Sequence, residues 1–404
     1  MNRSFILALA MPVVFTVAFW LVLPSAYRVS ESTDFSGFYE PVAKRILAGD
    51  GITTESGAVA MRYPPGYPMV LAAVIGAGGA VGLSEEHVLQ LLALMCVALS
   101  SLFLHVMARD IWTGWRALAP SLAFSTYPLA LWLTKQPNSE LVFMPLLFGC
   151  AYALWTLTRR VRPQASLIVA VGVLAAVAML VRPIALLLPF VCAALILALA
   201  MEWRLRTRAW VAAAVLGISG LVVLPWEVHA SRAAGRFILV ADLGVAALRS
   251  GLTFGVDNTN RAGIYVPDAV RTVMISFSAQ YDHLDTFGDI AHAVWSETIR
   301  HPLGMLGLAA MKMLRAWYGT DSQRLDGYVA LIQAAYVLLL AVAFTACWRQ
   351  GGERRRLAMI VGLMLVYFWG MSAVGLPLAR YMVPAIALAF VLVPAVSERA
   401  TGVG

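Results

Sequence analysis

Carboxylates and arginines interrupt or border the apolar segments of this chain at several points. Asp34 follows the first apolar run, Glu140 opens a later one, and Arg182 and Arg380 each lie between two such runs. Ionisable groups at membrane depth are costly and by default mark functional sites. A carboxylate can act as a general base toward a hydroxyl, and a guanidinium can bind a phosphate through two hydrogen bonds. These residue types suit an acceptor hydroxyl and an anionic lipid leaving group.

Each of these groups also has a purely structural explanation. Asp34 could cap a short helix, because Pro41 suits the first turn and Gly49 the C-terminal end of a helix in this loop. Glu140 could interact with the dipole of the helix that it opens. Arg182 could extend its side chain toward the headgroup layer. The functional interpretation depends on these groups converging on one face of the membrane.

The composition places the chain in a bilayer. Of its 404 residues, 61% are hydrophobic and 13% are charged, against about 25% charged in soluble domains. In lipid every backbone polar group must be satisfied internally, so continuous apolar runs predict helices. The formal charge of +8 comes mostly from arginines that border these runs, which excludes a nucleic-acid-binding surface. The cysteines lie inside apolar runs, and the histidines show no metal-binding spacing.

We therefore predict an all-α integral membrane protein with about ten transmembrane helices. The first apolar run is expected to stay as an uncleaved helix. Two further apolar segments, 66–83 and 302–318, are expected to be interfacial helices in the first and second large outer loops. The predicted spans cover residues 6–26, 87–107, 116–134, 140–157, 165–181, 184–201, 209–226, 328–348, 357–375 and 382–396.

The positive charges set the orientation of these spans. With ten spans, the arginine clusters at 159–162, 204–208 and 354–356 face the cytoplasm, as the positive-inside rule requires. The short outer loops then hold only Lys135, Arg182 and Arg380. We expect one polytopic membrane domain over residues 1–404, capped from outside by loops 28–83 and 227–327.

The order of these features resembles the GT-C superfamily of membrane glycosyltransferases, in particular its branch of protein O-mannosyltransferases and lipid A aminoarabinose transferases. Members have an acid in the first outer loop, an aromatic–Pro–Pro–Gly segment entering an interfacial helix, and an acid that opens a later helix. The matching features here are Asp34 with Tyr39, Tyr63-Pro64-Pro65-Gly66, Ser139-Glu140, Arg182-Pro183, Pro225-Trp226 and Arg380-Tyr381-Met382-Val383-Pro384. The resemblance touches most of the chain.

This resemblance implies a glycosyltransferase with a polyprenyl-phosphate sugar as its donor lipid and a glycan, lipid or protein as its acceptor. It implies inverting transfer at the extracytoplasmic face of the inner (plasma) membrane, with Asp34 as general base and Glu140 as an auxiliary acid. Donor phosphate contacts would come from Arg380, Arg62, Arg182 and Tyr381, and the substrate would be lined by Tyr39, Tyr63, Lys135 and Trp226. No cofactor or obligatory metal is expected, although a divalent metal is compatible with this chemistry.

Two other functions remain open from the sequence. A lipid-linked saccharide transporter or flippase would need ionisable residues in the middle of its spans, whereas the charges here cluster at span ends. A ligase that transfers a glycan from a lipid pyrophosphate would need a large outer loop with several arginines. The segment 227–301 carries Arg232, Arg236, Arg249, Arg261, Arg271 and Arg300.

Overall fold

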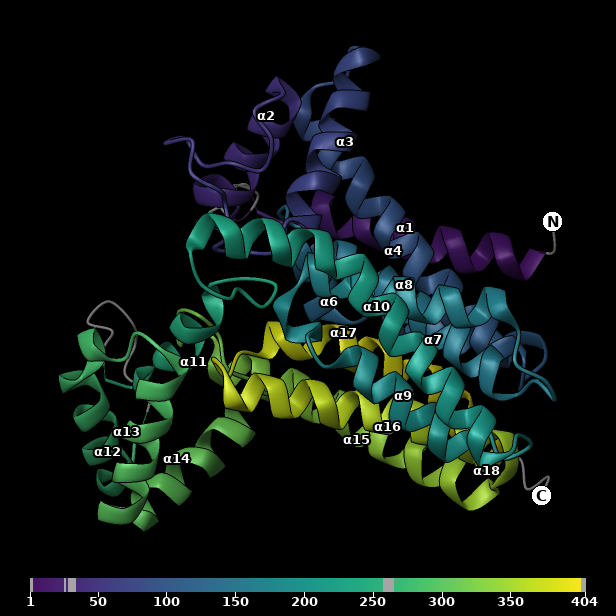
Figure 1. Cartoon of the computed structure of the whole chain (residues 1–404). Coiled ribbons are helices and arrows are strands. Elements are labelled where there is room, and N and C mark those ends of the chain that lie inside the picture. Colours follow the sequence, from purple (N-terminus) through teal and green to yellow (C-terminus); the bar gives the residue numbers. More distant parts are fainter. Residues whose placement is uncertain (1–2, 25–26, 28–33, 257–264, 401–404) are drawn as a thin grey trace. The chain divides into compact units, whose positions relative to one another are not determined.

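The described part of the chain is helical. The computed structural model describes residues 3–24, 27, 34–256 and 265–400; residues 28–33 of the first outer loop and Arg261 lie outside these ranges. Within them, the regular elements are helices (Figure 1), and the one isolated β-bridge described joins Thr53 to Val59. The prediction of an all-α integral membrane protein is confirmed.

Of the described helices, seven are long and apolar enough to cross a membrane. They are α1 (Arg3–Val22), α4 (Glu85–Arg109), α7 (Ser139–Thr158), α10 (Leu205–Ala234), α15 (Asp326–Gln350), α16 (Gly352–Val374) and the segment Ala379–Ser397. This last segment comprises α17 (Ala379–Ala389), η6 (Phe390–Leu392) and the start of α18 (Pro394–Ala400).

The three other predicted spans are shorter or interrupted. Two of them are α8 (Ala165–Val181) and the pair η4 (Pro183–Ala185) and α9 (Leu188–Leu199). The predicted span 116–134 divides into η3 (Gly114–Leu118), α5 (Ala119–Ser125) and α6 (Pro128–Leu133). Pro120 and Pro128 stand in the first turns of α5 and α6, because proline fits the start of a helix but cannot donate a hydrogen bond inside one. The number of ten spans stays a prediction.

The loops predicted to lie outside the membrane contain the short helices that their sequences predict. Helix α2 (Glu40–Ala48) has Pro41 in its first turn and ends at Gly49, whose φ of 87° lies in the left-handed region that glycine adopts easily. Helices α3 (Gly66–Ala80) and α14 (Pro302–Arg315) have 15 and 14 residues, fewer than the roughly 20 that a spanning helix needs.

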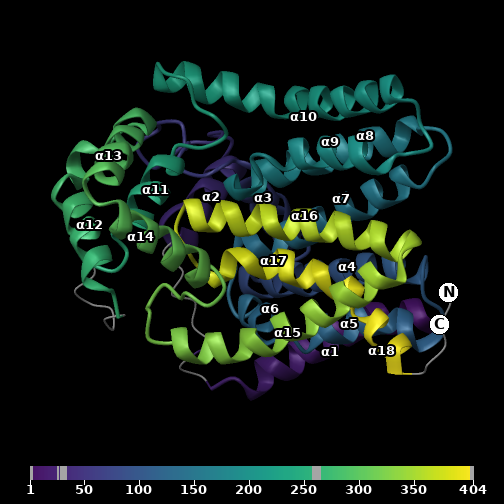
Figure 2. The same ribbon diagram turned by 90° about the horizontal axis from the view of Figure 1, so that it is seen from below.

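The chain divides into two compact units, each described here by itself. Unit 1 comprises Met1–Val240, Leu339–Met364 and Pro384–Gly404. Within it α8 packs between α7 and α10, and α10 also packs against α9 (Figures 1 and 2). Small residues allow this packing: a Cβ on Gly172 would meet Ile218 at 2.8 Å, and the Ser219 hydroxyl donates to the Gly172 carbonyl at 2.9 Å.

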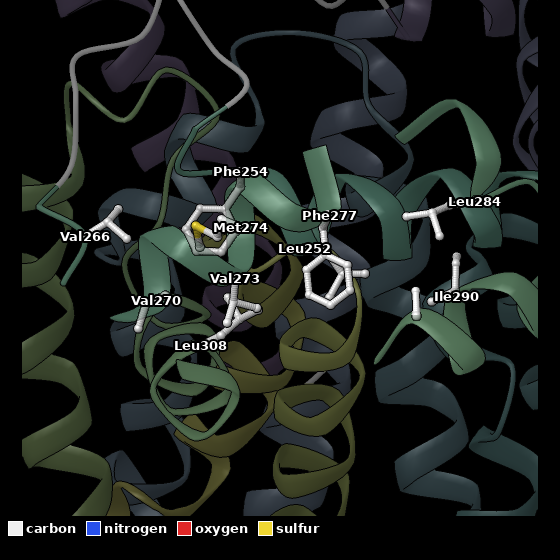
Figure 3. Packing of buried hydrophobic residues seen from close by; sticks show 11 residues of the cluster. Leu252, Phe254, Val266, Val270, Val273, Met274, Phe277, Leu284, Ile290 and Leu308 are labelled. Atoms are coloured by element: carbon white, nitrogen blue, oxygen red, sulfur yellow. The ribbon is translucent and has the colours of Figure 1, made fainter. Parts of the chain in front are cut away.

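Unit 2 comprises Ala241–Leu338 and Leu365–Val383. It contains α11 (Leu243–Thr253), α12 (Asp268–Ala279), η5 (Tyr281–His283), α13 (Phe287–Arg300) and α14. Their apolar residues form a core that includes Phe254, Met274, Val273 and Leu308 (Figure 3). The assignment of residues 1–404 to a single membrane domain stays a prediction.

Candidate active site

Asp34 stands directly before an unusual helical turn. Residues Phe35–Tyr39 form the π-helix η2, in which the Glu40 amide donates to the Phe35 carbonyl, and α2 follows without a break. Single π-helical turns are rare and frequent at functional sites. The Asp34 side chain makes no capping hydrogen bond to this helix. The helix-cap explanation for Asp34 is therefore wrong.

The Asp34 carboxylate is instead bound by a tyrosine from the Pro-Pro-Gly segment. The Tyr63 hydroxyl donates to Asp34 Oδ1 at 2.6 Å. The Tyr63 ring packs against the rings of Phe38 and Tyr39, with centroid distances of 5.0 and 4.9 Å. Burial and the hydrogen bond to Asp34 raise the pKa of Tyr63 well above its ordinary value. The phenol thus stays protonated and orients the carboxylate.

A buried ion pair joins the start of α7 to the end of α8. Arg182 Nη1 lies 2.5 Å from Glu140 Oε2 and donates to the Ser139 hydroxyl at 3.4 Å. Glu140 is 4% exposed and Arg182 is 8% exposed, so Arg182 does not extend into a headgroup layer. The extended backbone of Arg182 (φ −143°, ψ 127°) ends α8, as expected for a residue before proline.

Tyr39 connects Asp34 with this ion pair. Its pKa is raised well above the ordinary value, first by burial. The positive charge of Arg182 and a hydrogen bond with Ser139 oppose that shift, while the charges of Glu140 and Asp34 add to it. Because these effects act only over short distances, Tyr39 lies within electrostatic reach of all three charged groups. Asp34, Tyr39, Tyr63, Glu140 and Arg182 thus form one cluster, which we call the carboxylate cluster.

Glycine 66 sets the position of the Pro-Pro-Gly segment. A Cβ at this position would meet the Leu180 carbonyl oxygen at 2.6 Å and the Val181 nitrogen at 3.1 Å. The start of α3 therefore lies directly on the backbone of α8 at Leu180, which is two residues before Arg182. This contact places Tyr63, three residues upstream, on the same side as the ion pair. Only a residue without a side chain fits here.

The remaining predicted residues of unit 1 have other surroundings. The Arg62 guanidinium lies 5.5 Å from the centre of the Tyr63 ring, which brings it to the edge of the carboxylate cluster. Lys135 lies 4.4 Å over the Trp132 ring. Trp226 is buried and donates to the Val240 carbonyl at 2.7 Å, with Ile238 and Ala230 in the same small core. The roles assigned to Lys135 and Trp226 stay predictions.

Arg380 and Tyr381 belong to unit 2 and lie in the first turn of helix α17. Arg380 Nη1 lies 3.6 Å from Asp321 Oδ2, and its guanidinium carbon lies 5.2 Å from the centre of the Tyr381 ring. The Arg380 side chain is 34% exposed, so a ligand can reach it. Their role as phosphate contacts stays a prediction.

Three residues that contact the carboxylate cluster were not predicted as site residues: Ser139, Phe38 and Tyr67. The ring of Tyr67 packs edge-on against Tyr39 at 4.9 Å. Each of them could have been found because it is next to a residue of a quoted motif: Ser139 precedes Glu140, Phe38 precedes Tyr39 and Tyr67 follows Gly66. Among the described residues no group of three or more His, Cys, Asp or Glu side chains could hold a metal ion.

The cluster combines an oriented carboxylate with a buried carboxylate–guanidinium pair and several tyrosine hydroxyls. An oriented carboxylate can accept a proton from a hydroxyl within hydrogen-bond reach. Arginine and tyrosine can donate hydrogen bonds to an oxyanion. The arrangement is suited to proton abstraction from a hydroxyl beside a negatively charged leaving group.

Part of the chain matches a known protein family. Residues 66–228 match the dolichyl-phosphate-mannose-protein mannosyltransferase family. This range includes Gly66, Glu140, Arg182 and Trp226 but ends before unit 2. Among curated proteins, none matches the sequence.

Solved structures with a similar fold include the oligosaccharyltransferase AglB from Archaeoglobus fulgidus. Its complex with an inhibitory peptide and a dolichol-phosphate superposes with a TM-score of 0.58 and 10% identity, over 97% of this chain and 50% of that one. An oligosaccharyltransferase from the same archaeon, tethered to an acceptor peptide, gives a TM-score of 0.56 and 11% identity, over 98% of this chain and 49% of that one. ArnT from Cupriavidus metallidurans bound to undecaprenyl phosphate gives a TM-score of 0.44 and 16% identity, over 98% of this chain and 78% of that one.

The chain spans about half the length of the oligosaccharyltransferase that it matches. Because the identity is low, that likeness establishes the fold and not the activity. The family match over residues 66–228 and the shared fold together confirm that this chain resembles the GT-C superfamily of membrane glycosyltransferases.

Proposed function

We propose that this chain is a glycosyltransferase that moves a sugar from a polyprenyl-phosphate donor to an acceptor hydroxyl. The observation that carries the proposal is the carboxylate cluster, in which Tyr63 orients Asp34 at 2.6 Å while Tyr39 lies within reach of the Glu140–Arg182 pair. The family match, whose name includes a lipid-phosphate mannose donor, supports the same reaction class.

In the proposed reaction Asp34 is the general base. The acceptor oxygen attacks the anomeric carbon and transfers its proton to the Asp34 carboxylate. The bond between the anomeric carbon and the phosphate oxygen breaks, and its electron pair leaves with the lipid phosphate. Attack from the side opposite the phosphate inverts the anomeric centre. Because phosphate leaves readily, no general acid is required; help from the base accounts for roughly 10²–10⁴ in rate.

Glu140 serves in this proposal as an auxiliary acid that orients the acceptor. Its ion pair with Arg182 fixes both side chains before substrate binds, which is the preorganisation that favours transition-state stabilisation. Arg182 and Arg62 would donate to the leaving phosphate. Tyr39 and Tyr63 would line the substrate with hydroxyl groups that stay protonated.

Arg380 and Tyr381 are proposed as further phosphate contacts. Arginine suits this role because its planar guanidinium binds phosphate oxygens in pairs. The dolichol-phosphate in the AglB complex supports a lipid phosphate as the ligand class. The acceptor would be a glycan, a lipid or a protein, and the reaction would occur at the extracytoplasmic face of the plasma membrane, without an obligatory metal.

A transfer assay tests the proposal. The purified protein in lipid nanodiscs is incubated with a radiolabelled polyprenyl-phosphate sugar, beginning with mannose because of the family match, and with extracted envelope glycans, lipids and proteins as acceptors. The labelled sugar should move to one acceptor class, and the lipid phosphate should be released. Translocation of intact donor across a vesicle membrane without any sugar transfer would contradict the proposal.

A further inference from the structure

The turn that precedes Arg380 is bound to the end of α14 by a series of contacts. Helix α16 ends at Val374 and α17 begins at Ala379, so residues 375–378 form the turn. Four contacts follow one another along both segments: Lys312 Nζ donates to the Val374 carbonyl at 2.8 Å, Arg315 Nη1 to the Pro377 carbonyl at 3.2 Å, the Ala379 amide to the Gly319 carbonyl at 2.8 Å, and Arg380 Nη1 lies 3.6 Å from Asp321 Oδ2.

Close backbone packing keeps this turn in place. A Cβ on Gly319 would meet the Pro377 carbonyl oxygen at 2.5 Å, and a Cβ on Gly251 would meet the Gly375 carbonyl oxygen at 2.1 Å. Such contacts leave no room for the turn to shift toward α11 or toward the end of α14. The backbone that carries Arg380 is therefore held on two sides.

Arg315 is the central residue of this arrangement. It is 2% exposed, and its guanidinium lies 5.0 Å from the centre of the Phe254 ring. Its Nη2 donates to Asp326 Oδ2 and to the Thr320 carbonyl, both at 3.0 Å. Asp326 Oδ1 in turn accepts hydrogen bonds from the Thr320 amide and hydroxyl, both at 2.7 Å.

This network fixes geometry more than it adds stability. A buried ion pair gains little net free energy over well-packed apolar residues, because desolvation offsets the attraction. What the network does provide is a defined path for residues 316–326 and, through Pro377, for the turn before Arg380. The Arg380 side chain is 34% exposed, although the backbone of the turn before it is held in place.

We propose that Arg315 is a positioning residue that holds Arg380 in the orientation needed to bind the donor phosphate. This rests on the proposed function of Arg380 as a phosphate contact. Arg315 does not touch the lipid; it acts through the Pro377 carbonyl and the loop of Thr320 and Asp321. Loss of its contacts lets the Arg380 guanidinium sample orientations that do not match the phosphate, so donor affinity falls while the chemical step is retained.

The test compares Arg315→Lys, Arg380→Ala and the double variant in the nanodisc transfer assay. Arg315→Lys keeps the charge but loses the planar fork that reaches Pro377, Thr320 and Asp326 together. We expect it to raise the donor KM about tenfold, as Arg380→Ala does, with kcat within about twofold of the wild type. The donor KM of the double variant should differ from that of Arg380→Ala by less than about twofold, because the effects of residues that act as a unit are not additive.

A milder variant and a matched control complete the design. Thr320→Val removes one hydrogen bond to Asp326 with little change in side-chain volume. It replaces Arg315→Lys as the test variant if the Arg315→Lys protein does not give a sharp melting transition. We expect Thr320→Val to raise the donor KM about threefold. Arg249→Lys is the control. Like Arg315, Arg249 lies over an aromatic ring, at 4.1 Å from the centre of Tyr281, and forms an ion pair, but its partner Asp285 does not belong to the turn. This control variant should leave the donor KM unchanged.

Binding of undecaprenyl phosphate to nanodisc-embedded protein gives a readout that is independent of transfer. Arg315→Lys and Arg380→Ala should weaken this binding equally. If Arg380→Ala weakens donor use and neither Arg315→Lys nor Thr320→Val does, the positioning role is overturned while the phosphate contact stands. If Arg380→Ala has no effect, both assignments fall, and the response of Asp34 variants still decides the proposed reaction.

Discussion

Tyr63 and Asp34, 29 positions apart in the chain, are joined by a 2.6 Å hydrogen bond from the tyrosine hydroxyl to the carboxylate. This bond links the loop that follows α1 to the segment that enters α3. Because burial keeps the phenol protonated, Tyr63 acts as a donor and the carboxylate stays an acceptor. The relationship gives Asp34 a fixed orientation that a loop residue would otherwise lack.

Substitution of Gly66 tests whether the contact of α3 with α8 positions the cluster. Gly66→Ala places a methyl group 2.6 Å from the Leu180 carbonyl oxygen, so the start of α3 must shift, at a cost of about 1–3 kcal/mol. We expect a lower melting temperature and a marked loss of sugar transfer. Gly79→Ala is the matched control in the same helix, because no atom lies within 4 Å of its Cβ position. A Gly66→Ala variant as active as Gly79→Ala would show that this contact does not place Tyr63.

The Glu140–Arg182 pair should be sensitive to the loss of one partner. Glu140→Gln or Arg182→Met leaves a buried charge without its counter-charge, which typically costs about 3–5 kcal/mol. The double variant should regain much of the thermal stability but not the activity. The pair of Arg249 and Asp285, in which the Asp285 side chain is 73% exposed, provides the comparison, since breaking it should cost about 0–1 kcal/mol. Equal melting temperatures for the two single variants, the double variant and a variant that breaks the Arg249–Asp285 pair would contradict the buried pairing.

Lys312 predicts a pH dependence of stability. Burial lowers the pKa of this lysine from its ordinary value of 10.5 to about 7. Between these two values the unfolded chain binds a proton that the folded chain does not bind. Stability should therefore rise with pH in this window, with a slope of up to about 1.4 kcal/mol per pH unit, and level off below the folded pKa.

Thermal melting of the wild type and of Lys312→Met between pH 7 and 9.5 measures this effect. The variant should lose the rise, whereas Lys44→Met, which alters a lysine with a 53% exposed side chain, should keep it. Parallel curves for wild type and Lys312→Met would show that Lys312 is charged in the folded protein.

Cysteine labelling tests the predicted orientation in the membrane. The four native cysteines of the chain are buried, so the background with an impermeant thiol reagent should be low. A cysteine placed at the exposed Ser56 should be modified from outside intact cells, and one placed at Arg160 should be modified only after the membrane is opened. Labelling of the Arg160 position from outside would reverse the assignment of faces.

Local signals in the sequence predicted much of the fold. The lengths of the apolar runs identified the long helices, and Pro41 and Gly49 predicted the two ends of α2. The Pro-Pro-Gly segment predicted the start of α3. The interruption of the span 116–134 was missed because hydrophobicity outweighed Pro120 and Pro128, whose effect on a helix depends on the local backbone.

Side-chain partnerships could not be predicted in the same way. The ion pair of Glu140 with Arg182 depends on how α7 packs against α8, and the hydrogen bond of Tyr63 depends on the contact of Gly66 with Leu180. Arg315 stood at the end of a helix that its sequence predicts to be interfacial, yet it is buried by contacts with residues about 60 positions away. Such long-range contacts are set by tertiary packing.

In the proposed reaction Asp34 accepts the proton of the acceptor hydroxyl. Asp34→Asn keeps the size of the side chain and its ability to accept the Tyr63 hydrogen bond, but removes the basic carboxylate. Expression and thermal stability should thus stay near those of the wild type. Tyr63→Phe, which leaves the carboxylate but removes its orienting donor, should reduce transfer by an intermediate amount of about tenfold.

The most direct measurement is the rate of sugar transfer from a polyprenyl-phosphate donor by the purified Asp34→Asn protein in lipid nanodiscs, with Glu140→Gln measured beside it. The transfer rate of Asp34→Asn should fall by about two to four orders of magnitude, at unchanged donor binding. Wild-type rates of transfer by a folded Asp34→Asn protein would show that Asp34 is not the general base.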